Sequence, residues 1–288
     1  MTSLEELRAT PRIATTEPRW VRRIVIGISV AFLGLFVLVP LAAVITAALS
    51  QGVDAYLDAL KDPAAMRALR LTLLAAVIAV PLNLVFGVAA AWAIARFRFP
   101  GRAFLITLID LPLAVSPVIA GMVFVLLFGA HGLLGPWLAS HHVKVIFALP
   151  GIVLATTFVT FPYVARELIP LMESQGSEEE EAALVLGASP WQMFFRVTLP
   201  RIKWGLLYGV VLCTARAMGE FGAVSVVSGN VRGRTSTLPL HVEILYNEYE
   251  HQAAFAVASL LVIIGIASLI ARRVIGLRAR AEREEERS

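Results

Sequence analysis

Six long apolar runs divide the chain, with charged and polar residues gathered between them. The runs lie at about 24–49, 69–95, 104–129, 145–165, 205–229 and 252–271. A helix needs roughly 20 apolar residues to cross the hydrocarbon core of a membrane. The pattern therefore predicts an all-α membrane protein with about six transmembrane helices. Because the first run is too long and starts too far into the chain for a signal peptide, we expect it to be a retained helix.

Prolines lie inside or near several of these runs. A spanning helix tolerates proline where neighbouring groups satisfy the carbonyl that proline leaves free. We therefore expect several broken or kinked helices, with the boundaries hardest to place near 111–117. The prolines are Pro40, Pro81, Pro112, Pro117 and Pro162.

The composition also indicates a membrane protein. Of 288 residues, 58% are hydrophobic and 16% are charged, whereas soluble domains have about 25% charged residues. This balance excludes an ordinary cytosolic enzyme and a disordered chain. The net charge is only +4, and the basic residues flank the apolar runs, which is not typical of a nucleic-acid binder. Cys213 is the single cysteine, so the chain has no intrachain disulfide.

The distribution of arginine and lysine predicts the orientation. The N-terminal tail, the loop after the second run, the segment after the fourth run and the C-terminal tail hold 18 of these residues, whereas the alternate loops hold 6. Cytoplasmic segments carry the excess of positive charge. We therefore predict that both termini are cytoplasmic, which agrees with an even number of spans.

These features divide the chain into four parts. Residues 1–23 are predicted to be a cytoplasmic N-terminal arm, and 24–65 the first transmembrane helix with an external loop. Residues 66–272 hold the other five spans. Residues 273–288 are predicted to be a charged cytoplasmic tail.

One connection does not fit a simple helical bundle. About 39 residues, 166–204, separate the fourth and fifth spans on the predicted cytoplasmic side, and connections of this length are often functional. Ser177 and Glu180 have the spacing of a capping box at the start of a short helix. The run Glu178–Glu181 then places negative charge in the first turn, where the helix dipole favours it. Gly187 is suited to ending this helix.

A second short helix is expected to follow the glycine. Ser189 is a favourable N-cap, and Pro190 suits the first helical position. Trp191 and neighbouring aromatic residues give this helix an apolar face, and Pro200 is expected to end it. The segment is therefore predicted to be a helix, a glycine break and a second helix that lie against the cytoplasmic ends of the bundle.

Three short blocks in this segment have a characteristic spacing over 20 residues. The arrangement resembles the EAA motif of the permease subunits of bacterial ABC importers, in which the last block usually begins with isoleucine rather than valine. The spacing of three fixed blocks is a strong signal. The blocks are Glu181-Ala182-Ala183, Gly187 and Val197-x-Leu199-Pro200.

The wider sequence is similar to one group of these permeases. It looks like the W-type permeases of sulfate and thiosulfate importers, to which the molybdate permeases are related. The resemblance covers about residues 66–272, which we expect to form a type-1 ABC transmembrane permease domain. The stretches that carry it are 174–176, 186–189, 196–200, 215–229 and 238–240.

The resemblance implies a half-transporter of the bacterial inner membrane with the architecture of a type I importer. In this family the EAA segment forms a coupling helix that docks on a separate ABC ATPase subunit. Besides membrane lipid, the implied partners are a second homologous permease and a periplasmic binding protein for sulfate or thiosulfate. The residues assigned to coupling are Glu181, Ala182, Ala183, Gly187, Val197, Leu199 and Pro200. Without the full spacing, the acidic run would be interpreted as a solvated first turn.

The chain lacks its own sequence for ATP binding or catalysis. A P-loop requires Gly-Lys followed by Ser or Thr, and the three lysines follow leucine, valine and isoleucine. If ATP drives transport, another chain must bind it. His141 and His142 are adjacent in a predicted external loop, so we expect neither a metal site nor a cofactor. No catalytic set is found, and no enzyme function is predicted.

Three ionisable residues inside the apolar runs are functional candidates, since charge is costly in a membrane. Arg216 and Glu220 are four residues apart, so they share a helix face and can pair. The pair either offsets its own burial or lines the translocation path, where Arg216 would attract an oxyanion. Asp110 is favoured as a cap at a helix break beside Pro112.

Other functions stay open at this stage. One is the import of molybdate or tungstate by the same kind of permease. Another is a secondary transporter or channel that works alone, which would need intramembrane carboxylates and have no use for a coupling segment. The segment 230–251 is expected to be an external loop, either a docking surface for a binding protein or a plain solvated connection.

Overall fold

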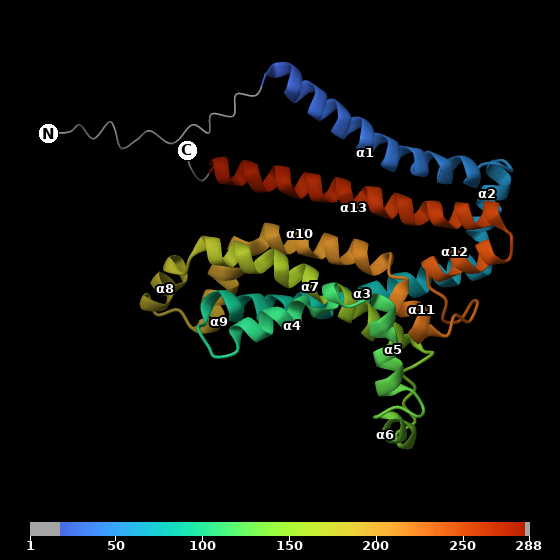
Figure 1. The fold of residues 1–288 in the computed structure, drawn as a ribbon. Helices are drawn as coiled ribbons and strands as arrows, with labels where there is room; N and C mark the ends of the chain where they lie inside the picture. The colour runs from blue at the N-terminus through green and yellow to red at the C-terminus, as the bar shows by residue number, and fades with distance from the viewer. Residues whose placement is uncertain (1–17, 286–288) are drawn as a thin grey trace. The chain divides into compact units, whose positions relative to one another are not determined.

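The computed structural model describes residues 18–285, and the regular secondary structure in that range is helical (Figure 1). The chain divides into one unit that ends at Thr46 and a second that begins at Ala47, and each is described by itself. The predicted arm up to residue 17 and the tail from residue 286 lie outside the described residues. The elements are α1 (Arg19–Ala48), α2 (Val53–Lys61), α3 (Pro63–Arg96), α4 (Arg102–Ala114), α5 (Pro117–Phe128), α6 (Gly135–Ser140), α7 (Leu149–Gln175), α8 (Glu178–Val185), α9 (Pro190–Met193), a π-helical turn (Phe194–Thr198), α10 (Leu199–Met218), α11 (Gly222–Ser228), α12 (Leu238–Asn247) and α13 (His251–Glu285).

Helix α1 makes up the described part of the first unit. No residue of its most apolar stretch is buried, and the helix is apolar on all sides. A helix of this kind suits a lipid environment. The helix begins at Arg19, so the last residues of the predicted N-terminal arm are already helical.

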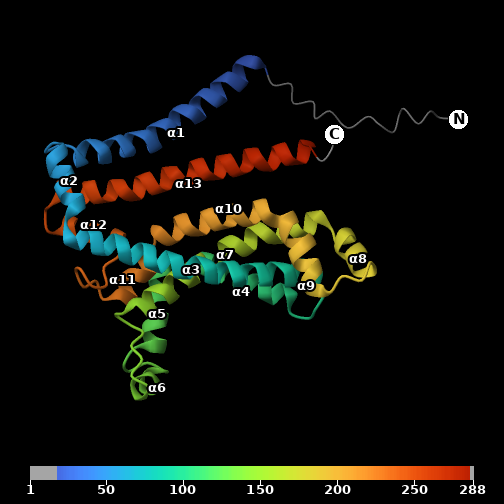
Figure 2. The same ribbon diagram turned by 180° about the vertical axis from the view of Figure 1, so that it is seen from behind.

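Three helices, α3, α7 and α10, run side by side at the centre of the second unit (Figures 1 and 2). They enclose a core of small and aliphatic side chains that includes Val164, Leu168 and Ile202. The backbones approach closely because Gly87 and Gly209 both face Val164, and a Cβ on Gly87 would lie only 2.9 Å from the Val164 Cβ. Small residues at helix crossings are the usual means of close packing in membranes.

Two of the predicted spans are bent helix pairs. Helices α4 and α5 meet at 107°, and α10 and α11 at 52°. The first break follows from Pro117, which holds the preceding Ser116 in an extended conformation with ψ of 131°. The second break begins at Gly219, where α10 ends. The expected break near 111–117 is therefore present, at the C-terminal end of that range.

The all-helical membrane fold is confirmed. Helices α1, α3, α7 and α13 are each long and apolar enough to cross a membrane, and the two bent pairs give six spans if each pair counts as one. Four of the five prolines in or near the apolar runs lie inside helices, and Pro117 is the first residue of α5. Helix α13 continues through Glu285, so the predicted tail from residue 273 is helical as far as the structure describes it.

The end of the second unit opposite α8 carries α2 and α12 (Figure 1). The prediction of a loop over 230–251 is wrong, because α12 lies within it. Leu238, Leu240 and Leu245 of this helix are buried, and the Leu238 amide donates a 2.7 Å hydrogen bond to Thr72 Oγ1 of α3. The segment is therefore a packed element rather than a solvated connection.

Candidate functional site

The predicted two-helix segment is present, but it leaves the bundle over a shorter length than expected. Helix α7 runs beyond the predicted end of the fourth span at 165 and continues to Gln175. Helix α9 passes through the π-helical turn directly into α10. Pro200 does not end the second helix, as predicted, but is the second residue of α10. Of the predicted connection 166–204, residues 176–198 lie outside α7 and α10.

The π-helical turn accounts for this continuity. Proline has no N–H, so the helical hydrogen bond to the residue four positions earlier is missing. The widened turn Phe194–Thr198 directly precedes Leu199 and Pro200 and accommodates this irregularity. The block Val197-x-Leu199-Pro200 is therefore a junction inside a helix. Single π-turns of this kind are frequent at functional sites.

The start of α8 differs from the predicted capping box. Ser177 is the N-cap, but its hydroxyl donates to Glu181 Oε1 at 2.6 Å instead of capping the backbone. Glu180 turns inward and is 4% exposed. The predicted reciprocal cap is wrong, because Glu180 has charged and polar partners inside the bundle.

Glu180 forms a buried ion pair with Arg96 at the C-terminus of α3. Arg96 Nε and Nη2 donate to the two carboxylate oxygens at 2.6 and 3.2 Å, and Arg96 Nη1 donates to the Met172 carbonyl at 2.7 Å. Thr198 Oγ1 donates to Glu180 Oε1 at 2.8 Å. Both charged side chains are less than one tenth exposed. This network joins α8 to α3, to α7 and to the π-helical turn.

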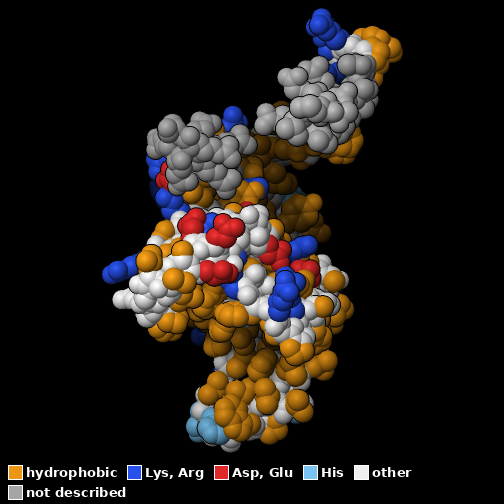
Figure 3. Space-filling view, turned by 90° about the vertical axis from the view of Figure 1, so that its left-hand side faces the viewer, with side chains coloured by type: hydrophobic (Ala, Val, Ile, Leu, Met, Phe, Trp, Pro, Cys, Tyr) orange, Lys and Arg blue, Asp and Glu red, His pale blue; other side chains and the backbone are white. Residues whose placement is uncertain are grey.

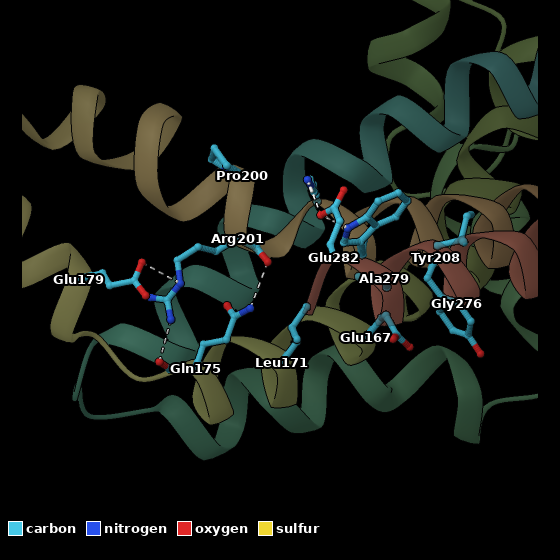
Figure 4. A pocket seen from close by; sticks show the side chains of 14 residues that line it. Glu167, Leu171, Gln175, Glu179, Pro200, Arg201, Tyr208, Gly276, Ala279 and Glu282 are labelled. Atoms are coloured by element: carbon cyan, nitrogen blue, oxygen red, sulfur yellow. Dashed lines mark hydrogen bonds and ion pairs between the residues drawn. The ribbon is translucent and has the colours of Figure 1, made fainter. Parts of the chain in front are cut away.

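Glu179 makes a second anchor on the side of α10. Arg201 Nε lies 3.2 Å from Glu179 Oε2, and Arg201 Nη2 donates to the Gln175 carbonyl at 3.1 Å (Figure 4). Gln175 Nε2 donates in return to the Arg201 carbonyl at 3.0 Å. The acidic run is therefore divided, since Glu179 and Glu180 pair with arginines of the bundle, whereas Glu178 and Glu181 form no ion pair among the described residues.

The turn between α8 and α9 has the predicted conformation. Gly187 has a φ of +89°, which favours glycine, and the space beside it is open. Ser189 caps α9 in a capping box with Gln192, in which the Ser189 amide donates to Gln192 Oε1 at 2.9 Å. The direction in which α9 leaves α8 is therefore set by local sequence.

The outer face of the segment is exposed and largely apolar. Val185, Leu186 and Trp191 are 88%, 87% and 73% exposed. Figure 3 views this end of the molecule, where acidic side chains gather with hydrophobic ones around them. An exposed apolar patch rimmed by charge outside the spanning part of a membrane protein indicates a protein interface. We define the α8–α9 surface as Glu181, Ala182, Val185, Leu186, Gly187, Trp191 and Phe195, all of which are exposed.

A groove of about 580 Å³ lies beside this surface between α7, α10 and α13 (Figure 4). Lys203 Nζ and Trp204 Nε1 each contact Glu282 Oε2 at 2.7 Å. The hydrogen bonds from Lys203 and Trp204 hold the pKa of the Glu282 carboxyl below its ordinary value. Glu282 follows the apolar part of α13, so this contact ties the helical extension of α13 to the start of α10.

Arg216 and Glu220 pair as predicted, but they do not share one continuous helix. Helix α10 ends at Met218, and Glu220 lies in the break before α11. Arg216 Nη1 is 2.6 Å from Glu220 Oε2, and Glu220 Oε1 accepts a 2.9 Å hydrogen bond from the Ala223 amide at the start of α11. Glu220 is 2% exposed, whereas the Arg216 side chain keeps 32% of its surface exposed. Arg216 is therefore the accessible member of the pair.

Asp110 is not a helix cap. It lies within α4, ahead of the break, and its Oδ1 is 3.3 Å from Arg166 Nε. Arg166, assigned from the sequence to a cytoplasmic connection, is inside α7. The prediction of a cap is wrong because the carboxylate has a charged partner on the neighbouring helix.

Comparison with known proteins identifies the family. Residues 83–281 match the model of the binding-protein-dependent transport system inner membrane component. The chain belongs to this family. The permease is therefore a multi-pass inner-membrane transport component, and the resemblance based on the EAA blocks is confirmed.

Individual relatives agree with this assignment. The permease is 51% identical over 269 residues to the sulfate transport system permease protein CysW of Escherichia coli, covering 93% of this chain and 92% of that protein. It is 38% identical over 260 residues to CysT of the same organism, covering 87% and 94%. Its fold matches a chain of a bacterial alginate ABC transporter in complex with an alginate-bound periplasmic protein, with a TM-score of 0.74 at 16% identity over 91% of this chain and 94% of that chain. The relatives are transport permeases and not enzymes.

Sequence reasoning missed the network of Arg96, Glu180 and Thr198. Arg96 contributed only to the charge count, and Thr198 lay inside the last EAA block without a role. Arg96 and Glu180 are 84 residues apart, so no local spacing reveals the pair. The one local signal was the run of four consecutive glutamates, which offered carboxylates on every side of the first turn without indicating which of them has a partner.

Proposed function

We propose that this permease carries sulfate, or the related thiosulfate, across the inner membrane as one half of an ATP-driven importer. The observation that carries the proposal is the 51% identity to a sulfate transport permease over nearly the full length of both chains. The α8–α9 surface lies where the EAA motif predicts a contact with an ATPase. A transporter that works alone would have no use for such a surface.

The proposed partner at the α8–α9 surface is a separate ABC ATPase subunit. Val185 and Trp191 supply exposed apolar area, and Glu181 supplies a charge that can pair with an arginine across the interface. The ion pairs of Glu179 and Glu180 hold α8 against the bundle. A displacement of this surface would therefore be passed to α3 and α10.

The other proposed partners complete the pathway. A second homologous permease, of the kind represented by CysT, would form the translocation path together with this chain. Arg216 is proposed to face that path, because its side chain is partly accessible and its charge can attract an oxyanion while Glu220 offsets part of that charge. Both termini are proposed to be cytoplasmic, which places α12 on the side of a periplasmic binding protein.

The test uses Glu181→Lys and Gly187→Trp in the complete transporter, reconstituted in proteoliposomes with radiolabelled sulfate. Reversing a charge in an interface turns attraction into repulsion, which can cost several kcal/mol. We expect uptake to fall about tenfold or more and co-purification of the ATPase to weaken, with expression unchanged. Matched controls for co-purification of the ATPase and for expression lie at the opposite end of the second unit: Gly52→Trp, also at positive φ in open space, and Glu250→Lys, also exposed.

Normal uptake by both variants would show that this segment is not the coupling element. Loss of uptake together with loss of expression would indicate that the two residues only stabilise the fold. Failure of the unmodified transporter to take up sulfate in the presence of its binding protein would overturn the proposed substrate.

A further inference from the structure

A second hollow lies at the end of the second unit opposite the α8–α9 surface. It measures about 360 Å³ and lies between the α6–α7 connection and the α11–α12 connection. Two cationic side chains, one from each connection, lie at its wall. The lining residues are Lys144, Phe147, Gly229, Val231, Arg234 and Thr235.

The two cations have no carboxylate partner among the described residues. Lys144 and Arg234 are both exposed, and no acidic group of the described chain lies within ion-pair distance of either. Arg232, in the same connection, is by contrast paired with Glu248 at 2.5 Å. The Arg67 guanidinium lies beside the backbone of this connection and adds a further positive charge. The hollow therefore has an uncompensated positive field, which attracts anions.

The backbone around the hollow is held in uncommon conformations. Phe147 and Asn230 have φ of 59° and 49°, in a region that residues other than glycine seldom adopt. The Phe147 amide donates a 2.8 Å hydrogen bond to the Val227 carbonyl. Its ring lies directly over Gly229, where an added Cβ would be 2.6 Å from the ring. The two connections are thus locked together, and the hollow between them is a fixed feature.

The donors at the wall suit a tetrahedral oxyanion. Lysine offers three N–H donors and arginine five. Thr235 Oγ1 accepts a 3.1 Å hydrogen bond from the Val231 amide, which leaves its own O–H free to donate. The volume corresponds to about a dozen waters at ~30 Å³ each. The hollow can therefore hold an oxyanion that keeps part of its hydration shell.

The position of the hollow relates it to the proposed path. Gly229 directly follows α11, and Glu220 caps the other end of the same helix and pairs with Arg216. Helix α11 has seven residues, so it is roughly 10 Å long. The hollow and the pair of Arg216 with Glu220 therefore lie at the two ends of one short helix.

We propose that this hollow, lined by Lys144 and Arg234, receives the sulfate dianion on the outer side of the permease before the ion reaches Arg216. The proposal rests on the proposed function. It assigns Lys144 and Arg234 the role of an anion-receiving site rather than that of solvated surface charges.

The test measures sulfate uptake by the reconstituted transporter as a function of the concentration of sulfate-loaded binding protein. Three variants remove charge: Lys144→Gln, Arg234→Gln and the two substitutions together. A double variant that carries Lys144→Arg and Arg234→Lys preserves both charges. Lys61→Gln removes an exposed charge elsewhere at the same end and is the matched control. We expect the double Gln variant to lower the maximal rate about three- to tenfold. The half-saturating concentration of binding protein, the ATPase activity without binding protein and the yield of assembled complex should not change.

Two outcomes would overturn the proposal. An increase in the half-saturating concentration with an unchanged maximal rate would show that the two cations bind acidic groups of the binding protein instead. Equal kinetics in the Gln variants and in Lys61→Gln would show that they are surface charges without a role. Both outcomes leave sulfate uptake by the unmodified transporter intact, so they are distinct from a failure of the proposed function.

Discussion

At the scale of single residues, the placement of α8 depends on a carboxylate that is not part of the EAA blocks. Glu180 is the residue immediately before them, and it is buried against Arg96 with Thr198 as a third partner. Glu181, the first residue of the blocks, is exposed, and its carboxylate accepts a hydrogen bond from Ser177, the N-cap of its own helix. Two adjacent glutamates therefore have opposite environments, one inside the bundle and one on the α8–α9 surface.

Removing Arg96 should be far more harmful than removing the neighbouring Arg201. Arg96→Met leaves Glu180 buried without its charged partner, which costs about 3–5 kcal/mol. Arg201→Met breaks a pair whose glutamate is 63% exposed, and exposed pairs contribute less than about 1 kcal/mol. Thermal unfolding of the purified protein measures the difference, and co-purification of the ATPase reports the position of α8.

A second variant keeps this prediction testable if Arg96→Met does not assemble. Replacing both partners with apolar residues, Arg96→Met with Glu180→Leu, removes the unpaired charge, so much of the lost stability should return. If the single and double variants were equally unstable, the ion pair could not be the cause.

The stability of the end that carries α12 should depend on pH through His241. Burial, together with the nearby Arg232, lowers the pKa of His241 below 6.5, whereas Asp62, Glu248 and Glu250 act in the opposite direction. Both ring nitrogens are buried without a hydrogen bond among the described residues. The folded protein therefore keeps this histidine neutral at a pH where the unfolded chain binds a proton.

The sign of the effect follows from proton binding. As the pH falls below about 6.5, the unfolded state binds more protons than the folded state, so the free energy of unfolding decreases. The unfolding midpoint should therefore drop on acidification, and the drop should be smaller in His241→Gln. His141→Gln, at an exposed histidine, is the control. Identical pH profiles for His241→Gln and the unmodified protein would contradict the assignment.

At the scale of elements, the sequence predicted the existence of helices better than their ends. The six apolar runs each correspond to a helix or a bent pair, because the length of an apolar stretch is a direct consequence of membrane thickness. The extension of α7 to Gln175 and the merging of α9 with α10 were not predicted. They depend on tertiary partners, such as the pairing of Gln175 with Arg201, and on a π-helical turn that tolerates Pro200.

The crossing of α5 and α11 should be sensitive to a single methyl group. A Cβ on Gly121 would lie 2.8 Å from the Ala223 carbonyl oxygen and 2.9 Å from the Val226 Cβ. Gly121→Ala should therefore force the two helices apart, at a cost of about 1–3 kcal/mol. Gly265→Ala in α13 meets nothing within 4 Å and should leave the unfolding midpoint unchanged or slightly higher. Equal midpoints for the two variants would show that the crossing is looser than described.

At the scale of the whole molecule, the candidate site was predicted in outline and the pathway was not. The EAA blocks located the α8–α9 surface because their spacing is local in sequence. The pairing of Arg216 with Glu220 was also local enough to predict. The hollow at Lys144 and Arg234 joins connections that are far apart in the chain, and no sequence pattern brings these two residues together.

The proposed orientation of the chain is tested by cysteine accessibility. The native Cys213 is buried, so single cysteines at Ser3, Glu286 and Glu250 report on their own positions once Cys213 is replaced by Ala. In intact cells with permeabilised outer membranes, an impermeant maleimide should label Glu250→Cys only. Ser3→Cys and Glu286→Cys should react after the inner membrane is opened. Labelling of either terminal cysteine in intact cells would contradict the 18-to-6 distribution of basic residues as a guide to orientation.

Because the π-helical turn continues directly into α10, a rotation at the start of this helix is transmitted along its length. Helix α10 has 20 residues and is therefore roughly 30 Å long. A tilt at its start moves its far end by roughly 0.5 Å for each degree, given that length. The far end is Gly219, where the chain bends by 52° into α11. A few degrees of rotation about the start of α10, imposed at the α8–α9 surface, would thus arrive as a displacement of an ångström or more at Arg216, and the glycine break is where α10 can move relative to α11.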